Sequence, residues 1–395
     1  KLTEVKHLYS NIELTLETNK LTIRNKNLFK DTSDYIFNIE LKKEGSLINK
    51  WTFEKVVPPL SVDYIEFEND QLLGQGEYVF TATVCLKEDT IWASKGHEID
   101  FTQMIVMVEG ETIKPSYDKP ELIIGDFNVG VVGKDFKIIF GKKEASIVSL
   151  VYNGIEHIAK HPNVTFFRAL TDNDNGNGSP FDFAQWEIAS RFARCIYENS
   201  KVLENLDSYE LSYTFITPTN PSFTYDVIYN VFFDGSIKVK VSYPGVDGLS
   251  NIPLIGMEFM LKNQYSNFTY YGLGEVENYC DRLNGVKLDV YSSTAKKNLT
   301  PYLNPQECGN RCKVRYVEVY DKKQNGIKFS YVNEPFEMSV LPYSSYELYN
   351  ARHQNELPNS RYTWVRIVGK QMGVGGDDSW GAKIHDEFLI DSKKP

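Results

Sequence analysis

Cysteine and histidine are scarce in this 395-residue sequence, and their placement excludes several kinds of catalytic and metal site. The five cysteines form no Cys-x-x-Cys pair, and no cysteines and histidines are grouped at the spacing of zinc ligands. The sequence also lacks the His-Glu-x-x-His, Gly-x-Ser-x-Gly and phosphate-loop motifs. We therefore expect no metal ion and no cofactor on this chain, and the odd number of cysteines favours a reducing compartment.

Long apolar runs and excess positive charge are absent as well. No stretch of about 18 or more apolar residues occurs, so no transmembrane helix is predicted. The N-terminal residues lack the apolar segment of a signal peptide, and the net charge of −10 would repel the phosphates of a nucleic acid. These absences predict a protein without membrane or nucleic-acid partners. The expected location is the cytoplasm, with the periplasm as the alternative.

Short alternating segments dominate instead, and they predict an all-β protein. Between residues 1 and 110, segments such as 12–16 and 21–23 alternate apolar and polar residues, turn residues separate them, and no helical pattern competes. About seven such segments in ~100 residues are typical of an immunoglobulin-like β-sandwich. Residues 111–120 are polar and contain two prolines, which indicates a linker.

The remaining residues, 121–395, continue as antiparallel strands with one evident helix at 180–198, which Ser179 would cap. These strands exceed what one sheet usually holds, so we expect two large stacked sheets. The sequence therefore predicts an immunoglobulin-like β-sandwich (1–110), a linker (111–120) and a large antiparallel β-sandwich (121–395).

A glycine-rich segment near the C-terminus, residues 371–381, is the most unusual local pattern. It combines four glycines, an Asp-Asp-Ser run that favours side-chain-to-backbone turns, and Trp380. A large aromatic side chain rarely occupies such a turn, because it usually belongs in a core. Two interpretations remain open from the pattern alone. Trp380 is either a flat apolar platform on which a sugar ring stacks, or a structural residue that covers the edge of a sheet.

Residues 167–178 have the Asp, Asn and Gly content of a calcium-binding loop. When Gly176 takes the glycine position of that motif, Thr171 and Asp182 stand where it requires Asp and Glu. A surface loop shaped by Asx turns is therefore the favoured interpretation.

Two glutamate-containing segments could also be mistaken for catalytic sites. Glu275 and Glu277 would lie roughly 6.5 Å apart on one strand, within the range of inverting glycosidases. Because two residues on one strand cannot easily flank a substrate, ion pairing with Arg282 and turn hydrogen bonds are preferred. Further along, a buried network between Glu307 and Arg311 is expected.

Together these segments resemble, in order and spacing, the C-terminal part of large bacterial β-galactosidases of glycoside hydrolase family 2. The matching segments are 168–176 (Arg-Ala, then Asp-Asn-Asp and Gly), 272–282 (two Gly, then Glu-Asn-Tyr and Asp-Arg), 305–311 (Pro, Glu, Gly and Arg) and 372–380 (Met-Gly, then Gly-Gly-Asp-Asp-Ser-Trp). Cys308 stands where the family commonly has Asn. The resemblance covers essentially the whole chain.

The resemblance implies both the fold and the division of labour. The family's chain carries a sugar-binding domain, an immunoglobulin-like domain, a catalytic (β/α)8 barrel, a second immunoglobulin-like domain and a β-supersandwich of galactose mutarotase-like fold. This sequence matches the last two. The barrel supplies both catalytic glutamates and the metal ligands, so the resemblance implies no catalytic residue in this chain. The Mg²⁺ and Na⁺ of the complete enzyme would bind mainly in the barrel.

The resemblance also assigns roles to individual residues. Trp380 matches an aromatic residue that stacks on the incoming β-galactoside at the mouth of the barrel. A loop that moves at the same mouth matches residues 174–179. The mouth loop comprises Asp174, Asn175, Gly176, Asn177, Gly178 and Ser179, and the support of Trp380 comprises Gly375, Gly376, Asp377, Asp378 and Ser379.

The function implied is that of a non-catalytic C-terminal portion of a retaining β-galactosidase, which completes the active site for substrates such as lactose and aids oligomer assembly. Its partner would be the catalytic barrel, in the same chain or in a large subunit. A free-standing carbohydrate-binding or structural β-sandwich module is the alternative. A sugar mutarotase of the same fold is disfavoured, because it needs a histidine acid and no histidine lies between residues 162 and 352.

Overall fold

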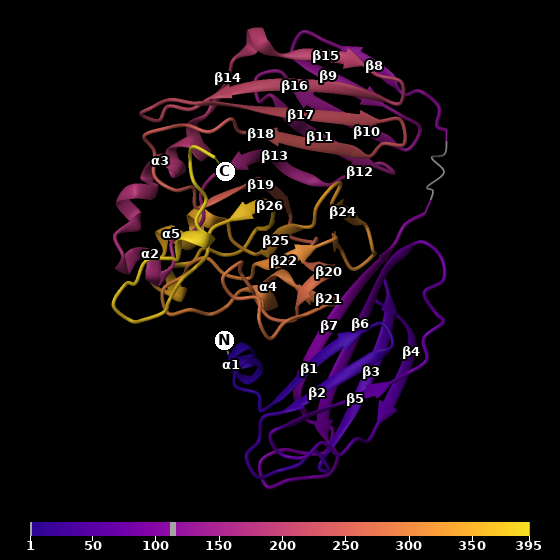
Figure 1. Cartoon of the computed structure of the whole chain (residues 1–395). Helices are drawn as coiled ribbons and strands as arrows, with labels where there is room; N and C mark the ends of the chain where they lie inside the picture. The colour runs from indigo at the N-terminus through magenta and orange to yellow at the C-terminus, as the bar shows by residue number, and fades with distance from the viewer. Residues whose placement is uncertain (1, 111–115, 395) are drawn as a thin grey trace. The chain divides into compact units, whose positions relative to one another are not determined.

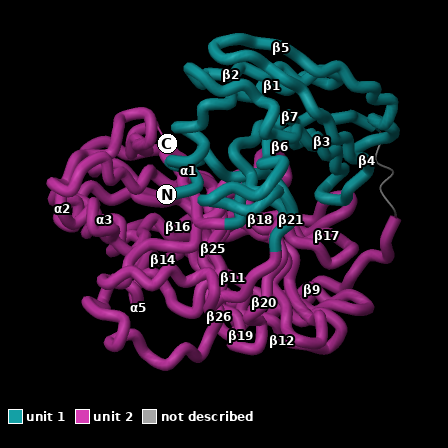
Figure 2. Tube along the Cα trace, turned by 90° about the horizontal axis from the view of Figure 1, so that it is seen from below, with its two compact units in different colours: residues 1–114, 271–275, 282–291 teal, residues 115–270, 276–281, 292–395 magenta. Residues whose placement is uncertain are grey.

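The computed structural model describes residues 2–110 and 116–394, which divide into two compact units (Figures 1 and 2). Unit 1 comprises residues 1–114, 271–275 and 282–291, and unit 2 comprises the rest of the chain. Antiparallel strands dominate both units, which confirms the all-β prediction. The predicted linker, 111–120, includes residues 111–115, which lie outside the described part of the chain.

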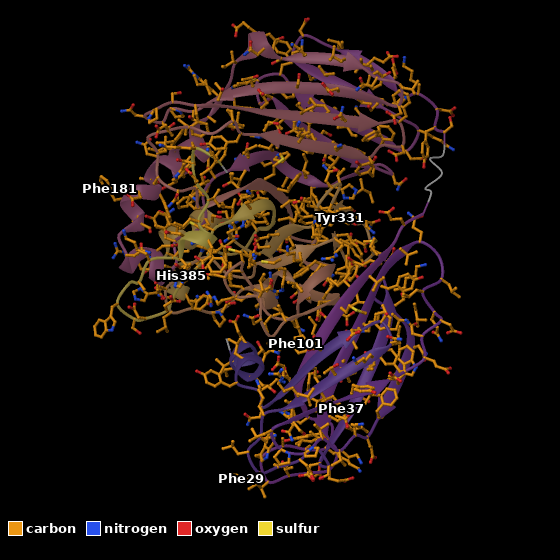
Figure 3. All side chains as sticks on the ribbon, viewed as in Figure 1. Phe29, Phe37, Phe101, Phe181, Tyr331 and His385 are labelled. Atoms are coloured by element: carbon orange, nitrogen blue, oxygen red, sulfur yellow. The ribbon has the colours of Figure 1, made fainter. Side chains whose placement is uncertain are left out.

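Unit 1 is a β-sandwich in which strands such as β1 (Ile12–Glu17) and β2 (Lys20–Asn25) bury every second side chain. Strand β1 alternates buried and exposed residues and pairs with β2 across a tight turn. Apolar residues of both sheets form one core, with Phe37 in its interior (Figure 3). The sheets have the strand orders β1-β2-β5 and β4-β3-β6-β7, with β3 (Tyr35–Lys43), β4 (Ser46–Phe53), β5 (Ser61–Glu66), β6 (Gly76–Leu86) and β7 (Glu98–Val108).

The first residues of unit 1 differ from the prediction, which had no helix there. They form helix α1 (Leu2–Leu8), in which Leu2, Val5 and Leu8 recur at helical rather than strand spacing.

The other strands continue the alternation along the chain. They are β8 (Glu121–Ile124), β9 (Asn128–Val132), β10 (Phe136–Gly141), β11 (Ser146–Tyr152), β12 (Ile155–Glu156), β13 (Ile158–Thr165), β14 (Arg194–Cys195), β15 (Lys201–Glu204), β16 (Ser208–Ile216), β17 (Thr224–Phe232), β18 (Ile237–Ser242), β19 (Leu254–Lys262), β20 (Asn267–Gly274), β21 (Lys287–Thr294), β22 (Arg311–Val314), β23 (Tyr316–Tyr320), β24 (Gly326–Ser330), β25 (Phe336–Leu341) and β26 (Tyr362–Gln371).

These strands form several shorter sheets rather than the two large ones expected. Their orders are β12-β11-β10-β9-β8, β13-β19-β26-β25-β22, β14-β16-β17-β18 with β15 beside β16, and β21-β20-β23-β24. One physical reason is that twisted sheets of many strands tend to split into smaller ones. The strand pairing is also irregular in places, for example at the register shift between Ile139 and Phe140. Within unit 2 the sheets still pack face to face, since the rings of Phe140 and Tyr229 lie 5.2 Å apart (Figure 1).

The predicted helix at 180–198 is present but shorter. Helix α3 spans Ser179–Phe192, and its N-cap is Gly178, whose φ of 88° suits glycine, rather than Ser179. The helix ends early because Arg194 and Cys195 pair with β16 as strand β14. The remaining helices are α2 (Asp172–Gly176), α4 (Ala295–Asn298), α5 (Ser345–Asn350), and the 3-10 turns η1 (Tyr197–Asn199), η2 (Gln354–Glu356) and η3 (Asp386–Phe388).

Candidate functional site at the glycine-rich turn

A fully buried arginine joins the first and last sequence motifs. Arg168 donates from its guanidinium to the carbonyl oxygens of Met372, at 2.7 Å, and Gly373, at 2.8 Å. The same group forms a buried ion pair of 3.1 Å with Asp174. Loss of one partner from such a pair leaves an uncompensated buried charge and costs ~3–5 kcal/mol. The start of the glycine-rich turn is therefore held rigidly.

The segment predicted as a surface loop is instead partly buried and helical. Helix α2 begins with a capping box, in which the Thr171 hydroxyl accepts from the Asp174 amide and the Asp174 carboxylate accepts from the Thr171 amide, both at 3.0 Å. Thr171 is thus the N-cap of a helix at the position where a calcium loop would place its first ligand. Among the described residues no group of three or more His, Cys, Asp or Glu could hold a metal ion.

A carboxylate from the second motif fixes the turn from another side. Asp281 accepts hydrogen bonds from the backbone amides of Val374, at 2.8 Å, and Gly375, at 2.7 Å. Gly375 has a φ of +61°, and a Cβ atom there would approach the Asn173 side chain to 2.5 Å. The left-handed backbone conformation favours glycine at this position, and a side chain there would also displace the terminal amide of Asn173.

Helix α2 and the glycine-rich turn lie in direct backbone contact. A Cβ atom on Gly381, whose φ is +85°, would approach the carbonyl carbon and oxygen of Gly176 to 2.6 Å. Asp378 then shapes the tip of the turn by accepting from the amides of Trp380, at 2.8 Å, and Ala382, at 3.0 Å. The two segments that the sequence singled out, 174–179 and 375–380, are therefore neighbours.

The side chain of Trp380 extends into solvent from this anchored turn. It is 90% exposed, so it covers no sheet edge among the residues that the structure describes. Its neighbour Asp377 accepts a hydrogen bond from Nε2 of His385 at 2.6 Å. Sequence reasoning missed His385, because nothing in the local pattern shows that η3 returns to the turn (Figure 3).

The third motif contains a buried ion pair, with a different partner from the one expected. The buried Glu307 pairs with Arg366 of β26 at 2.6 Å, whereas the predicted partner, Arg311, donates to the hydroxyl of Tyr270. The amide of Glu307 also donates to the carbonyl of Ala169 at 3.2 Å. The prediction failed because Arg366 is distant in sequence and only the sheet brings it close.

The carboxylate of Glu277 is used in structural hydrogen bonds. It accepts from the hydroxyls of Thr300, at 2.9 Å, and Tyr302, at 2.5 Å, and from the amide of Gly309 at 2.8 Å. These donors lie 23 to 32 residues further along the chain, so the carboxylate of Glu277 makes long-range hydrogen bonds rather than the turn hydrogen bonds expected.

A cavity of about 480 Å³ opens beside α2. Residues of the first and third motifs form part of its wall, including Asp172 and Pro305, and Gln306 donates to Asp172 at 2.9 Å. The sequence did not predict this cavity, which is lined by Leu170, Asp172, Asn175, Asn304, Pro305, Tyr349, Asn350, Ala351 and Arg352.

Comparison with known protein families agrees with the resemblance seen in the motifs. Residues 132–395 match the model of the β-galactosidase small chain, and residues 21–107 match that of β-galactosidase domain 4. The chain belongs to the β-galactosidase small-chain family. Among the residues that the structure describes, no helix is both long enough and apolar enough to span a membrane.

The relatives differ in the share of their own length that this chain matches. A β-galactosidase from Streptococcus thermophilus is 39% identical over 393 residues, which cover 99% of this chain and 38% of the relative. One from Halalkalibacterium halodurans is 37% identical, over 99% of this chain and 39% of the relative. A β-galactosidase small subunit from Latilactobacillus sakei is 34% identical, over 69% of this chain and 93% of that subunit. The chain thus spans about two fifths of the longer relatives.

Proposed function

We propose that this chain is the non-catalytic C-terminal portion of a β-galactosidase that hydrolyses terminal β-D-galactosides such as lactose, and that Trp380 completes the mouth of the active site. One observation carries the proposal: a tryptophan is held in solvent by a turn that Arg168 and Asp281 anchor. Tryptophan combines a large apolar face with a polar N–H group, and it is therefore enriched at binding surfaces. The C–H face of a galactoside is a suitable partner for the indole ring.

Residues 174–179 would form the adjacent edge of the mouth. The contact between Gly176 and Gly381 supports this role, because any movement of the end of α2 must be transmitted to the turn that carries Trp380. The side chain of Asn175 faces the cavity beside α2 and would be within reach of a ligand there.

Catalysis would come from a (β/α)8 barrel of glycoside hydrolase family 2, in the same chain or in a large subunit. A retaining mechanism needs two carboxyl groups about 5–5.5 Å apart and free to react, whereas Glu277 and Glu307 are held by other groups of this chain. The greater length of the relatives leaves room for such a barrel. Mg²⁺ and Na⁺ would bind mainly there, and the complete enzyme would assemble as an oligomer in the cytoplasm.

Replacement of the tryptophan tests the platform directly. Trp380→Ala in the complete enzyme is expected to raise the KM for lactose roughly 5- to 150-fold, because loss of one ring-stacking contact costs ~1–3 kcal/mol. Steady-state kinetics with lactose would measure this.

A second exposed tryptophan provides the matched control. Trp92, in unit 1, is 63% exposed and precedes no glycine-rich turn, so Trp92→Ala should leave the KM unchanged. If Trp380→Ala changes neither KM nor kcat, Trp380 is not a substrate platform.

A further inference from the structure

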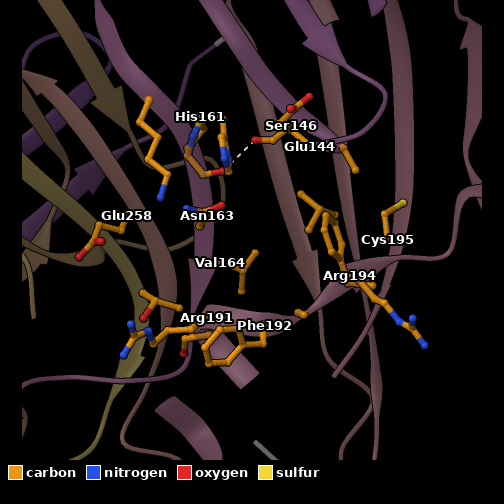
Figure 4. Close-up of a pocket in the computed structure, with 18 of the residues that line it drawn as sticks. Glu144, Ser146, His161, Asn163, Val164, Arg191, Phe192, Arg194, Cys195 and Glu258 are labelled. Carbon is orange, nitrogen blue, oxygen red and sulfur yellow. Dashed lines mark hydrogen bonds between the residues drawn. The ribbon is translucent and has the colours of Figure 1, made fainter. Parts of the chain in front are cut away.

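A second cavity of unit 2 is separate from the glycine-rich turn. It has a volume of about 660 Å³ and contains no residue of the four motifs (Figure 4). Cavities that bind small molecules usually have volumes of about 300–1,000 Å³. This cavity is therefore large enough for a small ligand, and neither the motifs nor the proposed function uses it.

One face of the sheet β13-β19-β26 forms the floor of the cavity. Glu258 of β19 stands opposite Asn163 of β13 and Arg366 of β26. Trp364 lies two residues before Arg366, and side chains two apart on a strand share a face. Asn163, Glu258 and Trp364 all line the cavity, so its floor combines an amide, a carboxyl group and a large aromatic ring.

Glu258 is the carboxyl group of this floor. Burial raises its pKa to about 7, although the charges of Arg366 and Lys160 act in the opposite direction. Near neutral pH the carboxyl group can therefore either donate or accept a hydrogen bond. In Figure 4 it lies on the same side of the cavity as Arg191.

Aromatic rings and a neutral histidine complete the walls. The ring of Tyr346 lines one wall and is stacked on Phe167 at 5.7 Å, which fixes its orientation. Nδ1 of His161 is buried and has no hydrogen-bond partner in the described residues, and burial lowers the pKa of this imidazole. Phe215 of β16 and Tyr225, Val227 and Tyr229 of β17 also line the cavity.

Charged groups of both signs line the cavity. Lys143, Lys160 and Arg194 are lining cations, and a fourth, Arg191, is paired with Glu187 at 2.9 Å. The carboxyl groups of Glu144 and Glu258 line the same cavity and disfavour a negative ligand. A sugar ring suits this lining, because its C–H face packs on aromatic rings and its hydroxyl groups pair with carboxyl, amide and imidazole groups. We propose that the cavity is a binding site for a neutral monosaccharide, distinct from the platform at Trp380.

Galactose and glucose are the probes, titrated calorimetrically into the 395-residue chain. Saturable binding at one site is expected. Glu258→Leu, which keeps a similar volume but removes the hydrogen-bonding group, should weaken binding about tenfold or more. Ala193→Trp, which adds a large side chain to the cavity lining, should abolish binding.

Two control variants locate the bound sugar. Ala184→Trp adds the same side chain at an exposed position of α3 outside the cavity and should bind sugar normally. Trp380→Ala should also bind normally, which separates this proposal from the proposed function. Circular dichroism would confirm that each variant is folded.

The proposal is overturned if the wild-type chain binds neither sugar. It is equally overturned if folded Glu258→Leu and Ala193→Trp bind as the wild type does, or if binding disappears in Trp380→Ala. Displacement of the sugar by inorganic phosphate would show an anion site instead and would also overturn it.

Discussion

At the scale of single residues, the properties of the site depend on partners that lie far along the chain. Asp377 and Asp378 are adjacent in sequence, yet they have different roles. Asp378 shapes the turn by accepting from backbone amides, whereas Asp377 binds the exposed imidazole of His385. The hydrogen bond to Asp377, together with the charges of Asp377 and Glu387, raises the pKa of His385 above its ordinary value near 6.5.

Because the pKa of His385 is raised, the contribution of its ion pair to the stability of the turn depends on pH. Because the folded pKa is raised, the ion pair contributes fully below pH ~6.5 and is lost as the pH rises through the folded value. Asp377→Asn is expected to lower the pKa of His385 measured by an NMR titration. Glu387→Gln should lower it less, because the Glu387 carboxylate lies 3.7 Å away. An unchanged pKa in Asp377→Asn would contradict the assignment.

At the scale of secondary-structure elements, the close approach of α2 to the glycine-rich turn is the decisive feature. Gly381 meets two constraints, a left-handed backbone and a neighbouring carbonyl group, whereas Gly376 meets only the first, since no atom lies within 4 Å of its Cβ position. The two glycines therefore allow backbone strain to be separated from packing.

Gly381→Ala should destabilise the protein more than Gly376→Ala does. A non-glycine residue in this conformation costs ~1–3 kcal/mol, and Gly381→Ala adds a clash with the backbone of Gly176. Denaturant unfolding monitored by tryptophan fluorescence would measure the difference in the free energy of unfolding. Equal effects of the two substitutions would mean that α2 and the turn move apart at little cost.

At the scale of the whole molecule, the described residues form a scaffold of antiparallel strands that carries the exposed Trp380. The carboxylates of Glu277 and Glu307 are both held in hydrogen-bond or ion-pair contacts within this scaffold. This chain matches about two fifths of each of the two longer relatives, so about three fifths of those proteins lie outside the region of similarity.

The purified 395-residue chain is therefore expected to show no hydrolysis of nitrophenyl galactoside. The physical reason is that a retaining mechanism needs a nucleophile and an acid/base across one bond. A spectrophotometric assay would test this, with the complete enzyme as the positive control. Measurable turnover by the chain alone would refute the division of labour proposed above.

The local sequence pattern was sufficient to predict the strands, because segments such as 12–16 and 21–23 alternate apolar and polar residues and the folded strands bury alternate side chains. The four motifs were likewise visible in the sequence, and they were enough to assign the family. Element limits were less accurate: α1 was missed, and α3 ended early because pairing with β16 prevailed over helical pattern.

What the sequence determined by itself was which segments matter, and only the tertiary structure decided how they act together. The glycine-rich turn left two roles open for Trp380, and its environment depends on contacts that no local pattern contains. Arg168 reaches Met372 and Gly373, and Glu307 pairs with Arg366 rather than with nearby Arg311, because buried charges take the partner that the folded sheets bring within reach.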